Sequence, residues 1–416
     1  MRVVLVSSAD IAGGAARSAY RLHASLRELG VDSRMVVNRK ESGDPDVYGP
    51  RTEVDKLVAA AVRRADRIPL QWPGARPETT WSVEWLPNGT LRRIRALRPD
   101  VVHLHWIGQG FVPIPALSRI RSALVWTLHD MWPFTGGCHY DGGCGRYQER
   151  CGSCPQLASK RTLDLSAVTW RAKRHYWSDI GIVIVAPSRW LADCARASSL
   201  FGGKRIEIIP YGVDLDCYRP VQKAIARNAL GLRQDVLLVA IAGTDDPRKG
   251  MRHVLAALEQ LEAQCGTAVH LAAFGETDPS LGRRLPVPTH YLGSLHDDVS
   301  LKLMYSAADV FVQPSQQDNL ANTVLEALAC GTPCVAFSTG GMPDLIDHKE
   351  TGYLARPFET SDLAQGISWV LGEPQRRITL GANARAKAER EFAAVLQARR
   401  YERLYHDLLA NSKPRA

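Results

Sequence analysis

Residues 310–337 read VFVQPSQQDNLANTVLEALACGTPCVAF. This stretch begins with the short apolar run Val310–Gln313 and ends with another at residues 333–337. Between the two runs the pattern becomes that of a helix, with Asn322 and Thr323 at its expected N-terminus. Short β-branched runs that alternate with helical patterns are typical of parallel strands in α/β domains. The stretch therefore predicts a strand–helix–strand unit of a parallel sheet.

The same alternation extends over the whole chain. In the first half the expected strands are residues 2–7, 33–37, 101–104, 124–128, 181–186 and 206–209. In the second half they are residues 236–242, 268–274, 290–292, 310–313 and 333–337. Amphipathic helices fit between them, for example at residues 15–29, 251–264, 299–307 and 361–371. The predicted fold class is α/β, with two doubly wound, Rossmann-like domains.

The chain length also indicates two domains, because 416 residues would normally divide into units of about 200 residues each. Residues 210–214 contain Pro and Gly directly after a strand, and we interpret them as the hinge. The domains are therefore expected at residues 1–212 and 213–416. We expect residues 44–88 to form a helix and a loop at the rim of the first domain. The last helices, at about residues 375–409, are expected to return to that domain.

The composition predicts a soluble, cytoplasmic protein. No apolar run approaches the roughly 18 residues of a membrane-spanning helix, and the N-terminal residues lack a signal-peptide pattern. The net charge is +9, and residues 1–220 contain 31 Lys and Arg against 21 Asp and Glu. This excess favours contact with an anionic surface such as a membrane, although an ordinary solvated surface explains it equally well. Nucleic acid is disfavoured as a partner, because the arginines lack interleaved aromatic residues.

Two loops that follow expected strands carry residue types suited to phosphate. Gly13 and Gly14 lie between the first strand and a helix, where they allow a ligand to approach the backbone and the helix N-terminus. A simple tight turn is the alternative. Arg248 and Lys249 follow the strand at residues 236–242 and can clamp a diphosphate. Taken alone, this pair fits two solvated cations as well.

A third loop leads into the expected helix after Val310–Gln313. Asn322 and Thr323 at its N-terminus are suited to contacts with phosphate oxygens, and Glu326 lies on the same helix face. A carboxylate in this place can accept hydrogen bonds from ribose hydroxyls. However, Thr323 and Glu326 also have the spacing of a capping box, in which Glu326 only satisfies a backbone N–H.

Taken together, these blocks resemble the retaining, two-Rossmann-domain (GT-B) glycosyltransferases of family 4, also called glycosyltransferase group 1. Among them, the chain is similar to bacterial exopolysaccharide enzymes of the colanic-acid type. The residues that carry the resemblance are Gly13, Gly14, the segment 209–214, Arg248, Lys249, Gly250, the segment 318–344 and residues 352–354. The segment 318–344 is the most specific of them.

The resemblance implies two domains that face a cleft, with a nucleotide-sugar donor bound mainly by the second domain. Arg248 and Lys249 would hold the diphosphate and stabilise the charge of the leaving group. Glu326 would hold the ribose, and Asn322 with Thr323 a phosphate. The family would need no metal or other cofactor for catalysis.

Two further residues are assigned by the resemblance. Asp318 occupies a position where the family commonly has Glu, so its carboxylate is one methylene shorter, and we expect it to contact the donor sugar. His129, at the end of the strand at residues 124–128, would face the transferred sugar. Transfer would retain the anomeric configuration without a covalent enzyme intermediate.

The acceptor expected from this resemblance is a lipid-linked oligosaccharide in surface or exopolysaccharide biosynthesis, reached by peripheral contact at the inner face of the plasma membrane. Two alternatives stay open. One is a GT-B enzyme that makes a small soluble glycoside. The other is a non-catalytic module that binds a nucleotide-sugar or nucleic acid.

Four cysteines lie close together in the sequence: Cys138, Cys144, Cys151 and Cys154. In a reducing cytoplasm this clustering favours a metal over disulfides, and zinc held by four thiolates is the simplest candidate. Free thiols are the alternative. The cluster defines a cysteine-rich insertion at about residues 136–156, which is expected to shape the acceptor cleft because it directly follows His129.

Overall fold

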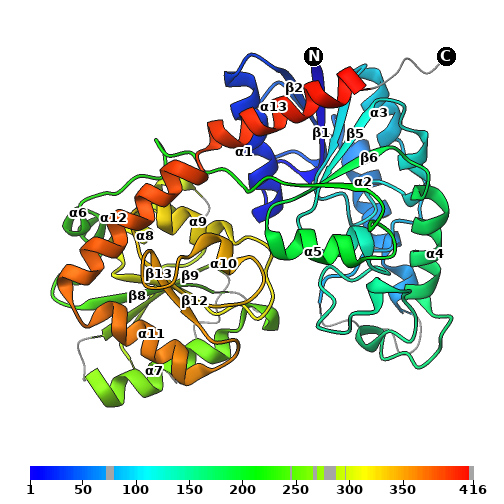
Figure 1. Cartoon of the computed structure of the whole chain (residues 1–416). Helices are drawn as coiled ribbons and strands as arrows, with labels where there is room; N and C mark the ends of the chain where they lie inside the picture. The colour runs from blue at the N-terminus through cyan, green and yellow to red at the C-terminus, as the bar shows by residue number, and fades with distance from the viewer. Residues whose placement is uncertain (72–78, 244–245, 266–268, 276–286, 296, 412–416) are drawn as a thin grey trace. The chain divides into compact units, whose positions relative to one another are not determined.

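The computed structural model describes residues 1–71, 79–243, 246–265, 269–275, 287–295 and 297–411. The chain forms two compact units (Figure 1). Unit 1 contains Met1–Gly212 and Val395–Ala416, and unit 2 contains Val213–Ala394. Each unit is built on one parallel sheet. The predicted α/β class with two doubly wound sheets is therefore confirmed.

The sheet of unit 1 has the strand order β3-β2-β1-β4-β5-β6-β7. Its strands are β1 (Arg2–Ala9), β2 (Asp32–Arg39), β3 (Val47–Tyr48), β4 (Val101–Leu104), β5 (Ala123–Thr127), β6 (Ile182–Ala186) and β7 (Arg205–Ile208). All pairings between them are parallel. The two-residue edge strand β3 was not predicted, because so short a run has no alternating pattern to recognise.

The sheet of unit 2 has the order β10-β9-β8-β11-β12-β13. Its strands are β8 (Leu237–Gly243), β9 (Val269–Gly275), β10 (Thr289–Tyr291), β11 (Val310–Gln313), β12 (Cys334–Phe337) and β13 (Gly352–Ala355). Ala268, the expected first residue of β9, lies outside the described residues. Strand β13 was not predicted. It begins with Gly352, where a Cβ atom would lie 2.0 Å from the carbonyl oxygen of Cys334 on β12.

Helices connect and cover the strands of both sheets. In unit 1 they are α1 (Gly14–Glu28), α2 (Glu53–Asp66), α3 (Thr90–Ala96), α4 (Leu165–Trp177), α5 (Arg189–Ala197) and, all but its first residue, α13 (Ala394–Asn411). In unit 2 they are α6 (Lys223–Ala229), α7 (Met251–Cys265), α8 (Asp298–Ala307), α9 (Asn322–Ala329), α10 (Met342–Leu345), α11 (Thr360–Leu371) and α12 (Pro374–Glu391). The four helices predicted between strands agree with α1, α7, α8 and α11 to within one residue at each end.

The sheet of unit 1 is buried on both faces, as expected for parallel strands. Val3 and Leu5 of β1 pack into one apolar cluster, and Val4 and Val6 pack into another. The first cluster includes side chains of α1 and α13, and Figure 1 shows these two helices beside each other. Tyr401 of α13 is fully buried there. The last helix is therefore part of the core of unit 1.

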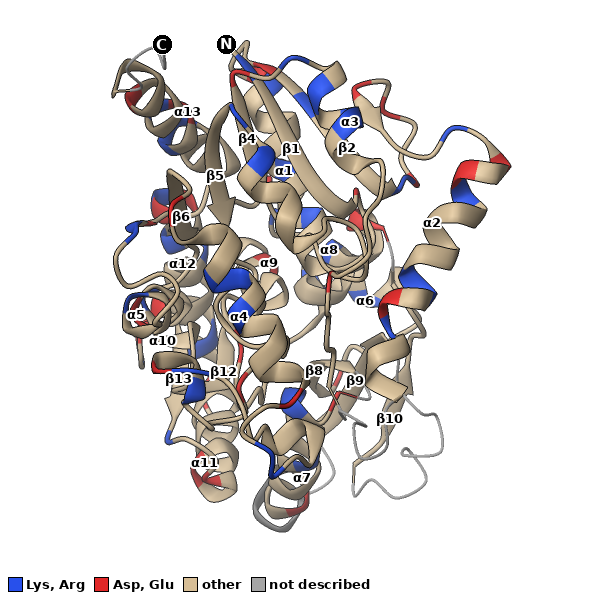
Figure 2. Ribbon diagram, turned by 90° about the vertical axis from the view of Figure 1, so that its right-hand side faces the viewer, with Lys and Arg blue, Asp and Glu red and all other residues tan. Residues whose placement is uncertain are grey.

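Helix α2 packs much less tightly than the other long helices of unit 1. Asp66 is its only buried residue, and Val54, Leu57 and Val58 are 68%, 70% and 56% exposed. Figure 2 shows α2 at the edge of the unit, with basic and acidic residues along it. In the described part of the chain, no helix combines the length and the apolar character needed to cross a membrane.

In unit 2, a buried ion pair joins α6 to the sheet. Asp309, directly before β11, accepts hydrogen bonds from Arg227 (Nη2 to Oδ2, 2.7 Å) and from the backbone N–H of Leu238 (2.8 Å). The guanidinium of Arg227 also donates to the carbonyl oxygens of Ala307 and Val236. Arg227 and Asp309 are only 2% and 5% exposed, so the guanidinium is buried together with its counter-charge.

We predict that Asp309→Ala lowers the free energy of unfolding by about 3–5 kcal/mol, because it leaves the Arg227 guanidinium buried without its counter-charge. The matched control is Asp235→Ala, which breaks the exposed Arg233–Asp235 pair and should cost less than about 1 kcal/mol. Urea unfolding of the full chain measures both variants. Equal losses would mean that the buried pair has no special role.

Candidate active site

The loops at the carboxyl ends of β1, β2 and β4 enclose a cavity of about 490 Å³ in unit 1. The chain passes from β1 to β2 in one direction along the sheet, and from β4 to β5 in the opposite direction. The strand order therefore reverses between β1 and β4. Ligands of open α/β sheets bind at such reversal points. We call this space the β1/β4 cavity. Its polar and aromatic lining residues include Asn38, Arg39, Lys56, Arg63, Trp106 and Gln109.

The two predicted glycines form one wall of this cavity. Gly13 is the N-cap residue of α1 and has a φ angle of 90°, a conformation that favours glycine. Gly14 begins the helix, and the first turn of α1 has neither a side-chain cap nor an acidic residue. The positive end of the helix dipole is therefore directed at the cavity.

Asp10, which sequence analysis did not single out, holds this loop in place. Its buried carboxylate accepts hydrogen bonds from the backbone N–H groups of Ile11, Glu41 and Ser42 at 2.9–3.0 Å. Burial alone would raise the pKa of Asp10, but the hydrogen bonds from Ser42 and its neighbours keep it below the ordinary value. A charged Asp10 thus ties the loop after β1 to the loop after β2.

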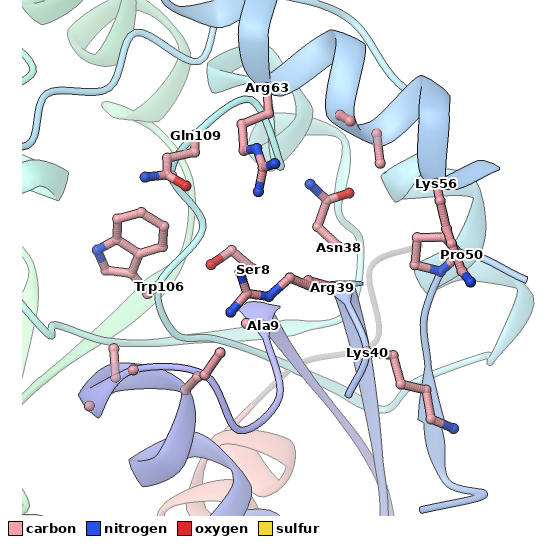
Figure 3. Close-up of a pocket in the computed structure, with 18 residues that line it drawn as sticks. Ser8, Ala9, Asn38, Arg39, Lys40, Pro50, Lys56, Arg63, Trp106 and Gln109 are labelled. Carbon is pink, nitrogen blue, oxygen red and sulfur yellow. The ribbon is translucent and has the colours of Figure 1, made fainter. Parts of the chain in front are cut away.

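The charge of the β1/β4 cavity is positive. Figure 3 shows Arg63 of α2 extending toward Asn38 and Ser8, with the guanidinium of Arg39 nearby. Among the described residues, no Asp or Glu lines the cavity. Arg39 pairs with Glu41 (2.8 Å) at the surface, whereas Arg63 has no ion pair or hydrogen bond within the described residues. The arrangement suits an anionic ligand.

His129 lies two residues beyond the end of β5 and is 8% exposed. Its Nδ1 is 2.7 Å from the hydroxyl of Tyr211, and its Nε2 is 3.0 Å from Nδ1 of His105. Burial lowers the pKa of His129 to about 4, so the ring is neutral near pH 7. Both ring nitrogens already have partners in unit 1. Sequence analysis gave no role to Tyr211, because its contact with His129 spans 82 residues.

His103 has a structural place on β4. Its ring nitrogens are 2.7 Å from the hydroxyls of Tyr405 and Thr127, and Thr127 is 2.6 Å from the hydroxyl of Tyr401. Burial lowers the pKa of His103 well below its usual value. This residue therefore helps to attach α13 to the sheet.

In unit 2, three of the predicted residues meet at the carboxyl ends of β8 and β11. Nζ of Lys249 is 2.6 Å from Oδ2 of Asp318, and Nη1 of Arg248 is 3.8 Å from Oδ1. Arg248 also pairs with Asp246 (2.8 Å) and donates to the carbonyl oxygen of Gln317 (2.6 Å). Burial would raise the pKa of Asp318, but Lys249 and Arg248 hold it below its ordinary value. Asp318 is therefore ionised.

The loop after β12 holds the backbone of Asp318 in place. The backbone N–H of Gly341 donates to the carbonyl oxygen of Asp318 at 3.0 Å. Gly340 has a φ angle of 55°, and a Cβ atom there would lie 2.0 Å from the same oxygen. Only glycine allows this approach, which gives a physical reason for the Gly340-Gly341 pair in the sequence.

The N-terminus of α9 differs from the capping-box alternative. The helix begins at Asn322 with Ala321 as its N-cap residue, and no side chain caps it. Thr323 instead donates to Oε1 of Gln313 at 3.1 Å. The carboxylate of Glu326, only 3% exposed, accepts a hydrogen bond from the hydroxyl of Tyr305 at 2.9 Å. The capping-box interpretation is therefore wrong.

The four clustered cysteines do not form the predicted zinc site. Among the described residues, no three His, Cys, Asp or Glu side chains are placed to hold a common metal ion, and all four cysteines are free thiols. Cys138 and Cys154 pack into an apolar cluster with Trp81. Burial raises the pKa of Cys138 well above its usual value and that of Cys151 to about 11.

Comparison with known proteins identifies the family. Residues 12–217 match the family described as Glycosyltransferase Family 4, and residues 222–387 match Glycosyl transferases group 1. The chain is 32% identical over 300 residues to a D-inositol 3-phosphate glycosyltransferase of Actinosynnema mirum, covering 68% of this chain and 67% of that one. This chain is a family 4, group 1 glycosyltransferase.

Further comparisons extend over nearly the whole glycosyltransferase. A Gordonia bronchialis protein of the same name is 26% identical over 402 residues, which are 91% of this chain and 80% of that one. Sucrose-phosphate synthase from Thermosynechococcus elongatus has the same fold (TM-score 0.73, 21% identity, 99% and 100% covered). Anabaena HepE, solved with UDP and glucose, has it too (TM-score 0.65, 19% identity, 98% and 100% covered). The D-inositol 3-phosphate glycosyltransferases support the enzyme class but not specifically an exopolysaccharide enzyme, and the two solved structures support the fold.

We predict that unit 1 loses stability as the pH falls from 6.5 toward 4. The unfolded state binds a proton at His129 below about pH 6.5, whereas the folded state resists it until about pH 4. Unfolding therefore takes up protons, and His129 alone would remove about 3 kcal/mol by pH 4. Thermal unfolding against pH for the wild type and His129→Gln measures this. Parallel curves for the two proteins would contradict the prediction.

Proposed function

We propose that this glycosyltransferase makes a small glycoside, by transferring a sugar from a nucleotide-sugar to a hydroxyl group of a small polyol that carries a phosphate. The observation that carries the proposal is the β1/β4 cavity. It combines Arg63, which has no partner in the described structure, with the N-terminus of α1, whose first turn has no acidic residue, and with a described lining that lacks carboxylates. The relatives are named D-inositol 3-phosphate glycosyltransferases, and that name describes an acceptor of this chemistry.

The donor is assigned to unit 2. We infer that Lys249 and Arg248 bind the diphosphate, and that their present carboxylate partners hold them in place before the donor arrives. Asp318 would meet the sugar hydroxyls as an ionised acceptor, and Glu326 the ribose. Asn322 and Thr323 would contact a phosphate at the N-terminus of α9.

The reaction proposed for these groups retains the anomeric configuration. The bond between the anomeric carbon and the diphosphate oxygen breaks, and the acceptor oxygen bonds to the anomeric carbon on the same face. The departing diphosphate takes the proton of the acceptor hydroxyl. Charge that develops on the diphosphate is stabilised by Lys249 and Arg248, and no residue of the chain needs to act as nucleophile. His129 stays a neutral, fixed group beside the transferred sugar.

A lipid-linked oligosaccharide at a membrane surface is the second candidate acceptor. The observation in its favour is α2, whose exposed Val54, Leu57 and Val58 lie on the same helix as basic Arg63 and Arg64. Such a helix is suited to the surface of an anionic bilayer. Sedimentation with vesicles that contain anionic lipid tests this candidate, and only binding that α2 substitutions abolish would favour it over the small acceptor.

For the donor, we predict that one of UDP-, GDP-, ADP- or dTDP-glucose raises the thermal midpoint of the wild type. At 100 times its dissociation constant the ligand adds about 2.7 kcal/mol of stability. Glu326→Ala should weaken or abolish this shift, because it removes the proposed ribose contact. The absence of a shift with all four ligands at millimolar concentration would contradict the donor assignment.

For the acceptor, we predict that Arg63→Ala raises the KM for D-inositol 3-phosphate by about tenfold to a hundredfold, the effect of losing a hydrogen bond between charged groups worth about 1.5–3 kcal/mol. The donor KM should not change. Arg64→Ala is the matched control, since Arg64 is exposed on the same helix but does not line the β1/β4 cavity. Similar KM values for the two variants would show that the acceptor phosphate does not bind at Arg63.

A further inference from the structure

A chain of buried hydrogen bonds joins Asp130, His139 and Ser82. Nδ1 of His139 is 2.6 Å from Oδ2 of Asp130, and Nε2 of His139 is 2.9 Å from the hydroxyl of Ser82. His139 lies in the cysteine-rich insertion. An isolated backbone bridge between Trp81 and Cys138 places the insertion beside the segment that contains Ser82. We call these three residues the Asp–His–Ser chain.

Both ends of the Asp–His–Ser chain contact the wall of the β1/β4 cavity. Nε1 of Trp106 donates to Oδ2 of Asp130 at 2.7 Å, and the backbone N–H of Gln109 donates to Oγ of Ser82 at 3.3 Å. Trp106 and Gln109 both line the cavity, as Figure 3 shows. The indole of Trp106 also stacks on the ring of His139, with 5.1 Å between the centroids.

The wall segment needs such support, because its backbone is strained. Gln109 has a φ angle of 61°, which side-chain-bearing residues seldom adopt, and Gly110 follows with 76°. A conformation of this kind persists only where the surroundings hold it. Next to the Ser82 contact, the carboxyl group of Glu84 accepts the N–H of Gly110 at 2.7 Å, and Asn88 donates to the Gly110 carbonyl at 2.9 Å.

The proton arrangement of the chain is consistent throughout. Burial would raise the pKa of Asp130, but His139 and the other donors keep it lowered, so the carboxylate is charged. It therefore accepts from Trp106 and from Nδ1 of His139, which leaves Nε2 to accept the hydroxyl proton of Ser82. Oγ of Ser82 can then accept the hydrogen bond from the backbone N–H of Gln109.

The same geometry is that of a nucleophilic Ser–His–Asp triad, but access excludes this role here. Ser82 is 0% exposed, and its hydroxyl faces the backbone of Gln109 instead of open space. Gly108 adds to this closure, since even a Cβ atom there would lie 2.9 Å from Oγ of Ser82. A substrate cannot approach the hydroxyl without displacing the wall.

We propose that Asp130, His139 and Ser82 are positioning residues for the acceptor. Through them, the cysteine-rich insertion fixes Trp106 and Gln109 so that the β1/β4 cavity keeps the shape its ligand needs. The proposal rests on the β1/β4 cavity being the acceptor site, as proposed above. It gives the insertion a function in acceptor binding that needs no metal.

The test compares Ser82→Ala with Ser198→Ala in the full chain. Ser198 is a matched control, because it is equally buried and its hydroxyl also accepts a backbone N–H, that of Phe201 at 3.0 Å, away from the cavity. Both variants should lower the thermal midpoint to a similar extent. Only Ser82→Ala should raise the KM for D-inositol 3-phosphate, by about tenfold (about 1.4 kcal/mol), with kcat and the donor KM within about twofold of the wild type.

A second measurement, hydrogen exchange, tests the positioning role without any acceptor. Hydrogen exchange of the segment 106–111 should speed up in Ser82→Ala and in His139→Gln, and stay unchanged in Ser198→Ala. In the Ser82→Ala/His139→Gln double variant the two effects should not add, because both act through one chain. Unchanged exchange in Ser82→Ala would overturn the positioning role. Faster exchange with an unchanged acceptor KM would instead show that the wall is positioned but that the acceptor lies elsewhere, which refutes the proposed site.

Discussion

The burial of both parallel sheets is the constraint on which the rest of this structure depends. Helices cover the two faces of each sheet, so the strand interiors are almost entirely apolar, and polar groups accumulate where strands end. In unit 1 these polar groups gather at the ends of β1 and β4. In unit 2 they gather at the ends of β8 and β11. The predicted glycines, cations and carboxylates are all found at these ends, because that is the one edge where backbone N–H groups and charged side chains can meet a ligand.

The two units use charge differently. In unit 2 the cations are held by carboxylates of their own loops, with Lys249 on Asp318 and Arg248 on Asp246. Such pairing fixes the groups before a ligand binds and lowers the cost of reorganisation. In unit 1, Arg63 extends from the loosely packed α2 into a space that no carboxylate lines. The first arrangement suits a precisely oriented reacting group, and the second suits the recognition of an anionic substituent.

The wall of the β1/β4 cavity shows how distant segments build one surface. Ser82 and Glu84 accept the backbone N–H groups of Gln109 and Gly110 on one side, and Asp130 accepts the indole N–H of Trp106 on the other. Glu84 is itself unusual, since burial and the neighbouring Asp66 raise the pKa of its carboxyl well above the ordinary value. The cysteine-rich insertion reaches this wall through His139, which contacts Asp130 and Ser82.

The sequence alone determined the fold class, most strand positions and the loops that bring Arg248, Lys249 and Asp318 together. Apolar periodicity and the Gly, Pro and charged residues between runs are local properties, so they can be read without the tertiary structure. It did not reveal β3 or β13, whose short runs are stabilised only by their neighbours. It also left Glu326 between a ribose contact and a capping box, and the start of α9 at Asn322 rules out only the capping box. Long-range packing sets the partners of His129, the unpaired state of Arg63 and the Asp–His–Ser chain. Spacing along the chain carries no information about which side chains will meet.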